Sequence, residues 1–128
     1  MRNAVEIERA ITSFARAPNG GLILTGSALA VVHRELIISL AARYGLPAIY
    51  YRRYFVASGG LVSYGPDVVE GFRGCAAYVD RILKGAKASD LPVQAPTKYE
   101  LAINLKAAKA LGLDIPATVL ARADDVID

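Results

Sequence analysis

Apolar positions in the first 24 residues of the chain follow two different spacings. Four of them recur every three or four residues, as on one face of a helix: Ile7, Ala10, Ile11 and Phe14. Asn3 stands where a helix cap is favoured, and Pro18 opens a Pro-Asn-Gly-Gly stretch that ends the helix. The run 22–24 is wholly apolar, which is typical of a strand buried on both faces. The pattern therefore predicts a helix followed by a buried strand.

Helical spacing returns after this strand and predicts a second helix from about Ala28 to Tyr44. Its inward positions are apolar: Leu29, Val32, Leu36, Leu40 and Ala41. Gly45 and Pro47 end the helix, and the next strand covers 47–50. A buried strand, a helix and a second buried strand form a βαβ unit, whose strands are parallel. The segment 51–55 that follows is expected to be short helical or irregular.

A third helix is predicted over 67–84, after a strand at 61–64. Pro66 suits a helix start, and Asp67 suits the positive end of the helix dipole. One face of this helix is apolar along its whole length: Val68, Val69, Phe72, Cys75, Ala76, Val79, Ile82 and Leu83. The helix ends at Gly85.

Shorter elements make up the rest of the chain. Strands are expected at 93–95 and 99–103, a short helix at 106–111, and another helix that begins at Pro116. Elements in this order predict an α/β fold of three layers, with a mostly parallel sheet and helices on both of its faces. Since 128 residues normally form one domain, we expect residues 1–128 to be a single α/β domain.

Composition favours a folded domain that binds neither nucleic acid nor a membrane interior. Hydrophobic residues make up 54% of the chain and charged residues 21%, which suffices for a buried core. The net charge of +3 comes from scattered basic residues, so it indicates solubility rather than a nucleic-acid-binding surface. No apolar stretch approaches the roughly 20 residues that cross a bilayer. The N-terminus lacks the apolar centre of a signal peptide, so the chain as written is expected to stay in the cytoplasm.

Thr25, Gly26 and Ser27 form a candidate ligand site because they follow a parallel strand and precede a helix. Backbone N–H groups at such a position attract carboxylate or phosphate groups, and ligands of open α/β sheets collect beside these strand ends. The alternative is a plain helix cap, in which Ser27 caps and Gly26 allows the turn. The phosphate-binding loop G-x-x-x-x-G-K-[ST] does not occur, so a nucleotide site is not expected.

A second candidate follows the next strand, where four aromatic residues and two arginines lie within 50–55. Aromatic rings stack on other rings or sugars, and a guanidinium group holds a carboxylate through two parallel hydrogen bonds. Tyr51 and Arg52 are therefore predicted to face an amino acid or an aromatic acid. The alternative is a solvated arginine pair beside tyrosines that cover the end of the sheet.

The other reactive residues are expected to be inert. Cys75 lies on the apolar face of the third predicted helix, where a small core residue is typical, and one cysteine allows no internal disulfide. His33, the single histidine, is expected at the surface or packed against a helix. These two residues cannot form a four-ligand zinc site by themselves, and no nucleophile and base can be paired into a catalytic centre. We therefore predict no metal, no cofactor and no catalytic residue.

The order of elements in the second half resembles that of one protein family. A strand at 61–64, an amphipathic helix that ends at Gly85 and a Leu-Pro-Val strand entry at 91–93 resemble the last crossing between the lobes of type I periplasmic solute-binding proteins. The stretches 96–113 and 115–127 resemble the C-terminal signature of ABC-transporter substrate-binding proteins of the tryptophan/tyrosine-uptake-like group. The resemblance covers essentially all of this chain but only about the C-terminal two fifths of a full member, whose two lobes are each the size of a typical domain. The chain therefore resembles a C-terminal fragment of such a protein.

The resemblance implies a periplasmic-binding-protein-like or flavodoxin-like half, with 61–95 as the crossing segment between lobes. It places Ser63 and Tyr64 beside the ligand and Gly65 at the hinge, whereas the alternative is a strand end without a ligand role. It also implies a solute-binding component of an ABC importer, which captures an amino acid or other small carboxylate, delivers it to a membrane permease and is periplasmic when full-length. No enzymatic activity is implied.

Other classes of function remain open at this point. An unpaired sheet edge tends to recruit another chain, so a self-associating module without ligand is one alternative. We predict a homodimer, with exchange of helix 67–84 between subunits as one way to form it. Two further alternatives are the sensor domain of a transcription regulator, for which no helix-turn-helix is visible, and a flavodoxin-like enzyme domain that works with a missing partner.

Overall fold

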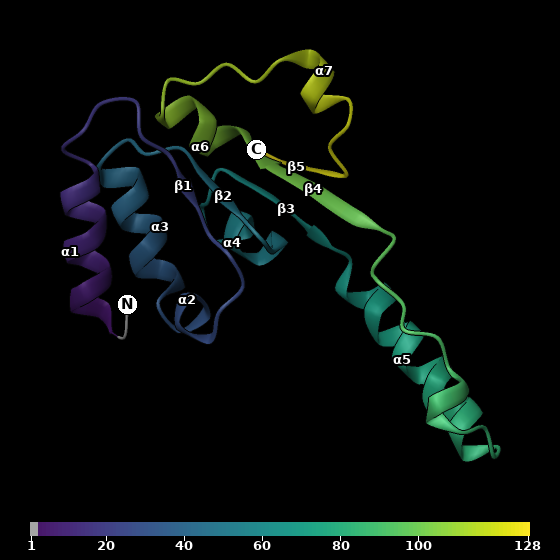
Figure 1. Cartoon of the computed structure of the whole chain (residues 1–128). Helices are drawn as coiled ribbons and strands as arrows, with labels where there is room; N and C mark the ends of the chain where they lie inside the picture. Colours follow the sequence, from purple (N-terminus) through teal and green to yellow (C-terminus); the bar gives the residue numbers. More distant parts are fainter. Residues whose placement is uncertain (1–2) are drawn as a thin grey trace. The chain divides into compact units, whose positions relative to one another are not determined.

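The computed structural model describes residues 3–128, which divide into two compact units (Figure 1). The first, here called the sheet unit, holds the described residues up to Gly65 together with Glu100–Asp128. The second, here called the helix unit, holds Pro66–Tyr99. The predicted crossing segment 61–95 overlaps most of the helix unit.

The sheet has five strands in the order β1-β2-β3-β4-β5. Their bounds are β1 Leu22–Ile23, β2 Ala48–Tyr50, β3 Val62–Pro66, β4 Tyr99–Asn104 and β5 Asp125–Ile127. β1 and β2, β2 and β3, and β4 and β5 pair in parallel. β4 runs antiparallel to β3, because Leu61 bonds to Asn104 at one end of the pair and Asp67 bonds to Lys98 at the other. The predicted α/β class with a mostly parallel sheet is therefore confirmed.

Six helices accompany this sheet within the described residues: α1 Ala4–Phe14, α2 Ala28–Val32, α3 Arg34–Arg43, α4 Arg53–Ala57, α6 Leu105–Ala110 and α7 Ala117–Leu120. α1 begins as the sequence predicts, since the side chain of Asn3 accepts a hydrogen bond of 2.9 Å from the backbone N–H of Glu6. α1 packs on α3 and buries Ile7 and Ile11. The core then continues from α3 through Leu40 to Tyr50 of β2 and Phe55 of α4.

β1 corrects one prediction. The run 22–24 was expected to be buried on both faces, yet Ile23 is 80% exposed and only Leu22–Ile23 form the strand. β1 lies at the edge of the sheet, with β2 as its one neighbouring strand. A side chain on β1 therefore has residues of a neighbouring strand on one side only. The apolar run identifies a strand correctly but not its position in the sheet.

The predicted helix 28–44 is also two helices. The chain leaves helical geometry at His33, whose φ of −101° and ψ of 24° separate α2 from α3. The break shifts the helical phase, so Val32 is exposed instead of inward and Ala30 is buried. His33 itself is half-buried, consistent with the expected surface or helix-packed position.

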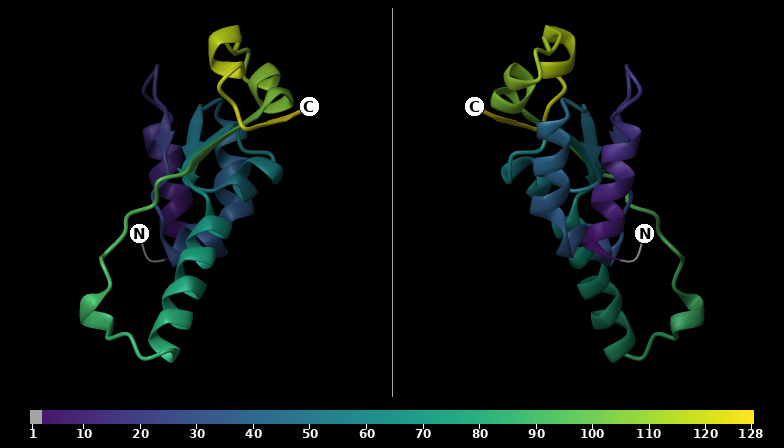
Figure 2. Two further views of the ribbon diagram at one scale, coloured as in Figure 1. Left: turned by 90° about the vertical axis from the view of Figure 1, so that its right-hand side faces the viewer. Right: turned by 90° about the vertical axis from the view of Figure 1, so that its left-hand side faces the viewer.

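The helix unit consists of α5 Val68–Leu83, a short 3-10 helix at Ala88–Asp90 and an extended return to β4 (Figure 2). Asp67 caps α5, because its Oδ1 accepts hydrogen bonds of 2.8 Å from Val69 N–H and 3.3 Å from Glu70 N–H. The strand predicted at 93–95 is wrong, since these residues form no strand. The Tyr78 hydroxyl donates to the Pro92 carbonyl, which ties this return segment to α5.

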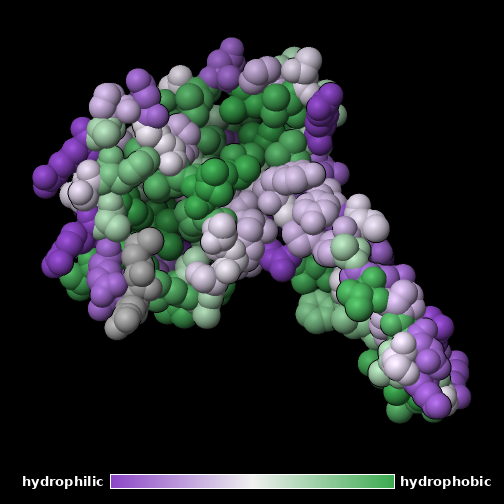
Figure 3. Space-filling view, viewed as in Figure 1, coloured by the Kyte–Doolittle hydropathy of each residue, from purple (hydrophilic) through white to green (hydrophobic). Residues whose placement is uncertain are grey.

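Every apolar residue on the predicted stripe of α5 is exposed, including Phe72 at 71% and Leu83 at 81%. Figure 3 shows the resulting apolar surface along the helix unit, interrupted by polar side chains. Cys75 is exposed as well, so its prediction as a core residue is wrong. The sequence identifies the apolar face of this helix, but the structure contains nothing that covers it among residues 3–128.

None of the helices in residues 3–128 combines the length and apolar character required to span a membrane. Within the same residues, no group of three or more His, Cys, Asp or Glu side chains is arranged to hold a metal ion.

Candidate functional site

The three predicted ligand-facing segments lie at the same edge of the sheet. Residues 25–27 follow β1, and Tyr51 and Arg52 follow β2. Ser63 and Tyr64 lie within β3, where Ser63 pairs with Tyr50, the last residue of β2. Because these three strands are parallel neighbours, their carboxyl ends meet at one edge. This edge is where open α/β sheets bind ligands.

Tyr51 is the centre of this edge. Its ring lies so close to Gly26 that a Cβ atom there would meet ring carbons at 3.5 Å. On the other side, a Cβ atom at Gly65 would overlap the carbonyl oxygen of Tyr51 and lie 3.0 Å from the carbonyl carbon. The guanidinium group of Arg52 lies 5.8 Å from the centre of the Tyr51 ring, within range of a cation–π contact. The structure thus brings Gly26, Tyr51 and Arg52 together.

Tyr51 belongs to a cluster of aromatic rings that is centred on Phe55. Phe55 is 0% exposed, and its ring centre lies 5.0 Å from that of Tyr50 and 5.5 Å from that of Tyr51. Tyr54 stacks on Phe55 at 4.8 Å. Some rings of the 50–55 segment therefore cover the end of the sheet, while Tyr51 remains half-buried at the surface.

The sequence left the role of Tyr54 within 50–55 open, and it gave no sign of Arg34, which contacts the Tyr54 ring. The hydroxyl of Tyr54 lies 3.1 Å from the hydroxyl of Tyr51, and Arg34 of α3 places its guanidinium group 5.6 Å from the Tyr54 ring centre. Burial and the hydrogen bond with Tyr51 raise the pKa of Tyr54 to about 12. The spacing of 51 and 54 by three residues is a signal for the tyrosine pair, but no local pattern connects Arg34 with either ring.

Ser27 acts as a helix cap. Its Oγ accepts a hydrogen bond of 3.1 Å from the backbone N–H of Ala30, as the capping alternative describes. α2 has only five residues, so it offers a weak dipole to an anion. Thr25 and Ser27 also line a groove of about 200 Å³, together with apolar residues that include Ile11 and Leu29.

Ser63 and Tyr64 point to opposite faces of β3, as consecutive strand residues do. Ser63 is 2% exposed and is in register with Tyr50, whereas Tyr64 is 54% exposed. Only Tyr64 is therefore accessible to a ligand from solution without rearrangement.

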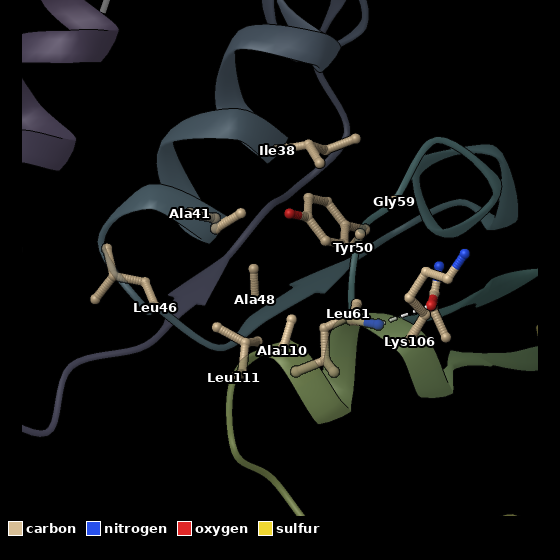
Figure 4. A pocket seen from close by; sticks show the side chains of 14 residues that line it. Ile38, Ala41, Leu46, Ala48, Tyr50, Gly59, Leu61, Lys106, Ala110 and Leu111 are labelled. Atoms are coloured by element: carbon tan, nitrogen blue, oxygen red, sulfur yellow. Dashed lines mark hydrogen bonds between the residues drawn. The ribbon is translucent and has the colours of Figure 1, made fainter. Parts of the chain in front are cut away.

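A separate cavity of about 190 Å³ lies between α3 and α6, and none of the predicted residues lines it (Figure 4). Its wall is mostly apolar, with Ile38 and Ala41 from α3, Tyr50 from β2 and Leu111 after α6. It adjoins the amino ends of β2 and β3, the end opposite to the one that binds ligands in open α/β sheets. It is also smaller than the roughly 300–1,000 Å³ of typical ligand pockets, so we do not assign it a ligand.

Comparison with known proteins identifies relatives of the whole chain. A family profile described as "ABC transporter substrate binding protein" matches residues 1–127. A conserved domain protein from Vibrio cholerae O1 biovar El Tor superposes with a TM-score of 0.85 at 27% identity, covering 98% of this chain and 42% of that one. An ABC domain from Streptococcus pneumoniae in complex with L-Trp superposes with a TM-score of 0.86 at 25% identity, covering 99% of this chain and 44% of that one.

A third structure supports the fold alone. It is the ligand-free, open form of a substrate binding protein with adhesive properties from Clostridium difficile, with a TM-score of 0.70 and 20% identity over 99% of this chain and 42% of that one. The chain thus spans less than half the length of the solved structures it matches. No curated protein sequence matches it significantly.

Proposed function

We propose a solute-binding function, starting from the fact that the chain belongs to the ABC transporter substrate-binding protein family. The proposed ligand is a small solute with a carboxylate group, with an amino acid as the first choice. The observation that carries the proposal is the grouping of Tyr51, Arg52 and Gly26 at the carboxyl edge of the sheet.

Each of these residues offers a contact that suits such a solute. The half-buried ring of Tyr51 provides a flat apolar surface, and Gly26 has no side chain to cover it. Arg52 supplies a cation able to hold a carboxylate with two hydrogen bonds. Tyr64, which is 54% exposed on β3, would add a further hydroxyl group to the site. The proposed action is binding without covalent chemistry.

The rest of the biological role is proposed from the family. A substrate-binding protein of an ABC importer binds its solute between two lobes and delivers it to a membrane permease, and this takes place in the periplasm. The lobes close because the closed state makes additional contacts with the ligand. In this chain the sheet unit would supply one wall of the site.

Isothermal titration calorimetry with L-tryptophan tests the binding function, because the Streptococcus pneumoniae neighbour holds L-Trp. Arg52→Gln should weaken binding about 10- to 100-fold, the effect of losing a charge-assisted hydrogen bond. Arg81→Gln on α5 is the matched control, since it removes the same charge from an exposed position outside the site. Absence of heat with tryptophan, tyrosine and a panel of other amino acids would refute solute binding by this chain.

A homodimer is our second proposal, and the uncharged face of α5 favours it. Five of its exposed residues alternate at spacings of four and three, the pattern of a helix–helix seam: Val68, Phe72, Cys75, Val79 and Ile82. The charged residues of α5 all lie elsewhere around the helix: Glu70, Arg73, Asp80 and Arg81. A second copy of α5 offers the same seam, so the surface is complementary to itself in a two-fold arrangement.

Cys75 stands at the middle of this seam, seven residues from both Val68 and Ile82. In an antiparallel pair of α5 helices, the two copies of Cys75 would therefore meet at the two-fold axis. Each Val68 would pack near the Ile82 of the other copy, and Phe72 near Val79.

Native mass spectrometry and light scattering at micromolar concentration test the dimer. Phe72→Asp should convert it to a monomer because a carboxylate would be buried in the seam. Ala77→Asp is the control, since it places the same charge on the other side of the helix. Mild oxidation should link two copies through Cys75. A wild-type monomer, or a dimer that survives Phe72→Asp, refutes this seam.

A further inference from the structure

Tyr51 and Tyr54 form a hydrogen-bonded pair of phenols at the proposed solute site. Their hydroxyl oxygens are 3.1 Å apart, and Tyr54 lies three residues after Tyr51, on the first turn of α4. Two hydroxyl groups bring two protons, and one of them lies in the shared hydrogen bond. The second proton remains for donation to another acceptor.

Neighbouring side chains restrict both rings. Phe55 contacts each of them, stacked with Tyr54 at an interplanar angle of 25° and tilted against Tyr51 at 56°. A guanidinium group lies over each ring, that of Arg52 over Tyr51 and that of Arg34 over Tyr54. The hydroxyl of Tyr54 thus holds the hydroxyl end of the Tyr51 ring. The other contacts of Tyr51 are made by its backbone carbonyl and by the face of its ring.

The hydroxyl group of Tyr54 keeps its proton at neutral pH. Burial raises the pKa of Tyr54 to about 12, so this phenol keeps its proton throughout the physiological range. Tyr54 therefore remains a hydrogen-bond donor within the pair and carries no negative charge that would repel an anionic solute.

We propose that Tyr54 is a positioning residue of the solute site, which holds the Tyr51 hydroxyl so that the pair offers one outward O–H donor to the solute. This role rests on the proposed binding function. Arg34 contributes by covering the Tyr54 ring from α3, which joins a helix outside the predicted site to the orientation of Tyr51.

Tyr54→Phe is the test variant because it removes the hydroxyl and keeps the ring on Phe55. Tyr44→Phe is the matched control: it also removes one tyrosine hydroxyl with a side-chain partner, the 3.1 Å contact with Thr12, but lies outside the site. With ring-labelled tyrosine, NMR of the ligand-free protein should show shifted and broadened Tyr51 signals in Tyr54→Phe and unchanged ones in Tyr44→Phe.

Affinity for L-tryptophan provides the second readout. Tyr54→Phe should weaken binding about three- to tenfold, the range for one neutral hydrogen bond. The same change should have no effect in a Tyr51→Phe background, because Tyr54 acts through Tyr51. Independent, additive effects of the two changes would overturn the positioning role.

The two readouts separate this inference from the binding function. Unchanged Tyr51 signals in Tyr54→Phe refute the positioning role even if tryptophan binds. If the signals change but the wild-type protein binds no amino acid, the tyrosine pair orders Tyr51 as inferred, and the solute-binding function is what fails.

Discussion

Gly65→Ala should destabilise the sheet unit, whereas Gly26→Ala on the other side of Tyr51 should be tolerated. A methyl group at Gly65 would overlap the carbonyl oxygen of Tyr51, and backbone atoms cannot rotate away as a side chain can. At Gly26 the added methyl would make ordinary contacts of 3.5–3.9 Å with the Tyr51 ring. Both glycines contact the same tyrosine, so the comparison isolates the type of contact.

The magnitude follows from two opposing terms. Overpacking of this kind costs about 1–3 kcal/mol. Replacing glycine by alanine also restricts the unfolded chain, which offsets about 0.4–1 kcal/mol where the native backbone suits alanine. Gly65→Ala should therefore lose about 1–2 kcal/mol of unfolding free energy. Gly26→Ala should change it by less than about 1 kcal/mol, in the stabilising direction.

Urea unfolding followed by far-ultraviolet circular dichroism measures both changes, since the chain has no tryptophan for fluorescence. The melting temperature of Gly65→Ala should fall by about 5–10 °C. Equal stability of Gly65→Ala and the wild type would show that β3 does not press on Tyr51 as the structure has it. A loss in Gly26→Ala as large as that in Gly65→Ala would equally contradict the reasoning.

Three further changes test other parts of the molecule. Phe55→Ala should cost about 3–5 kcal/mol of unfolding free energy by urea titration, because the ring is 0% exposed. Asn104→Ala should cost about 1–3 kcal/mol in the same assay, since this buried side chain bonds to the Val56 carbonyl at 3.2 Å and caps α6. The hydrogen bond from Lys98 holds the pKa of Asp67 below its ordinary 3.8, so the contribution of Asp67 to stability is complete above pH 3.8 and is lost as the pH falls further. In Asp67→Asn, the helical circular dichroism signal should therefore change less with pH below 3.8 than it does in the wild type.

The sequence predicts elements best where the signal is local. Asn3 and Asp67 cap the helices that they were expected to begin, because a cap depends only on residues within one turn. Gly85, which ends α5, has the positive φ of 103° that glycine adopts readily. The parallel order of β1, β2 and β3 also follows from the alternation of strands and helices.

Burial was harder to predict because it depends on what lies opposite an apolar residue. Ile23, Val32 and Cys75 all have the apolar character of core residues, yet they are exposed for different reasons. Ile23 lies at a sheet edge, Val32 precedes an unpredicted break at His33, and Cys75 lies on a helix face without cover among the described residues. Hydrophobic spacing identifies a face that favours burial, but not the partner that buries it.

The candidate site shows the same limit. Tyr51 and Arg52 could be selected from their residue types after a strand, whereas the contact of Arg34 with Tyr54 joins two helices that no sequence pattern connects. The close approach of Gly65 to Tyr51 depends likewise on how β3 aligns with the end of β2.

Because these contacts differ, changes near Tyr51 should affect ligand affinity and unfolding free energy to different degrees. The guanidinium group of Arg52 lies over the Tyr51 ring, so its loss should reduce ligand affinity and leave the unfolding free energy nearly unchanged. Tyr54 holds the ring through one hydroxyl, so its loss should affect affinity more than stability. Phe55 and Gly65 determine the position of the Tyr51 ring and backbone, so changes there should reduce both quantities together. An affinity loss in Arg52→Gln accompanied by equal destabilisation would mean that the arginine belongs to the packing of the sheet end and does not bind the solute directly.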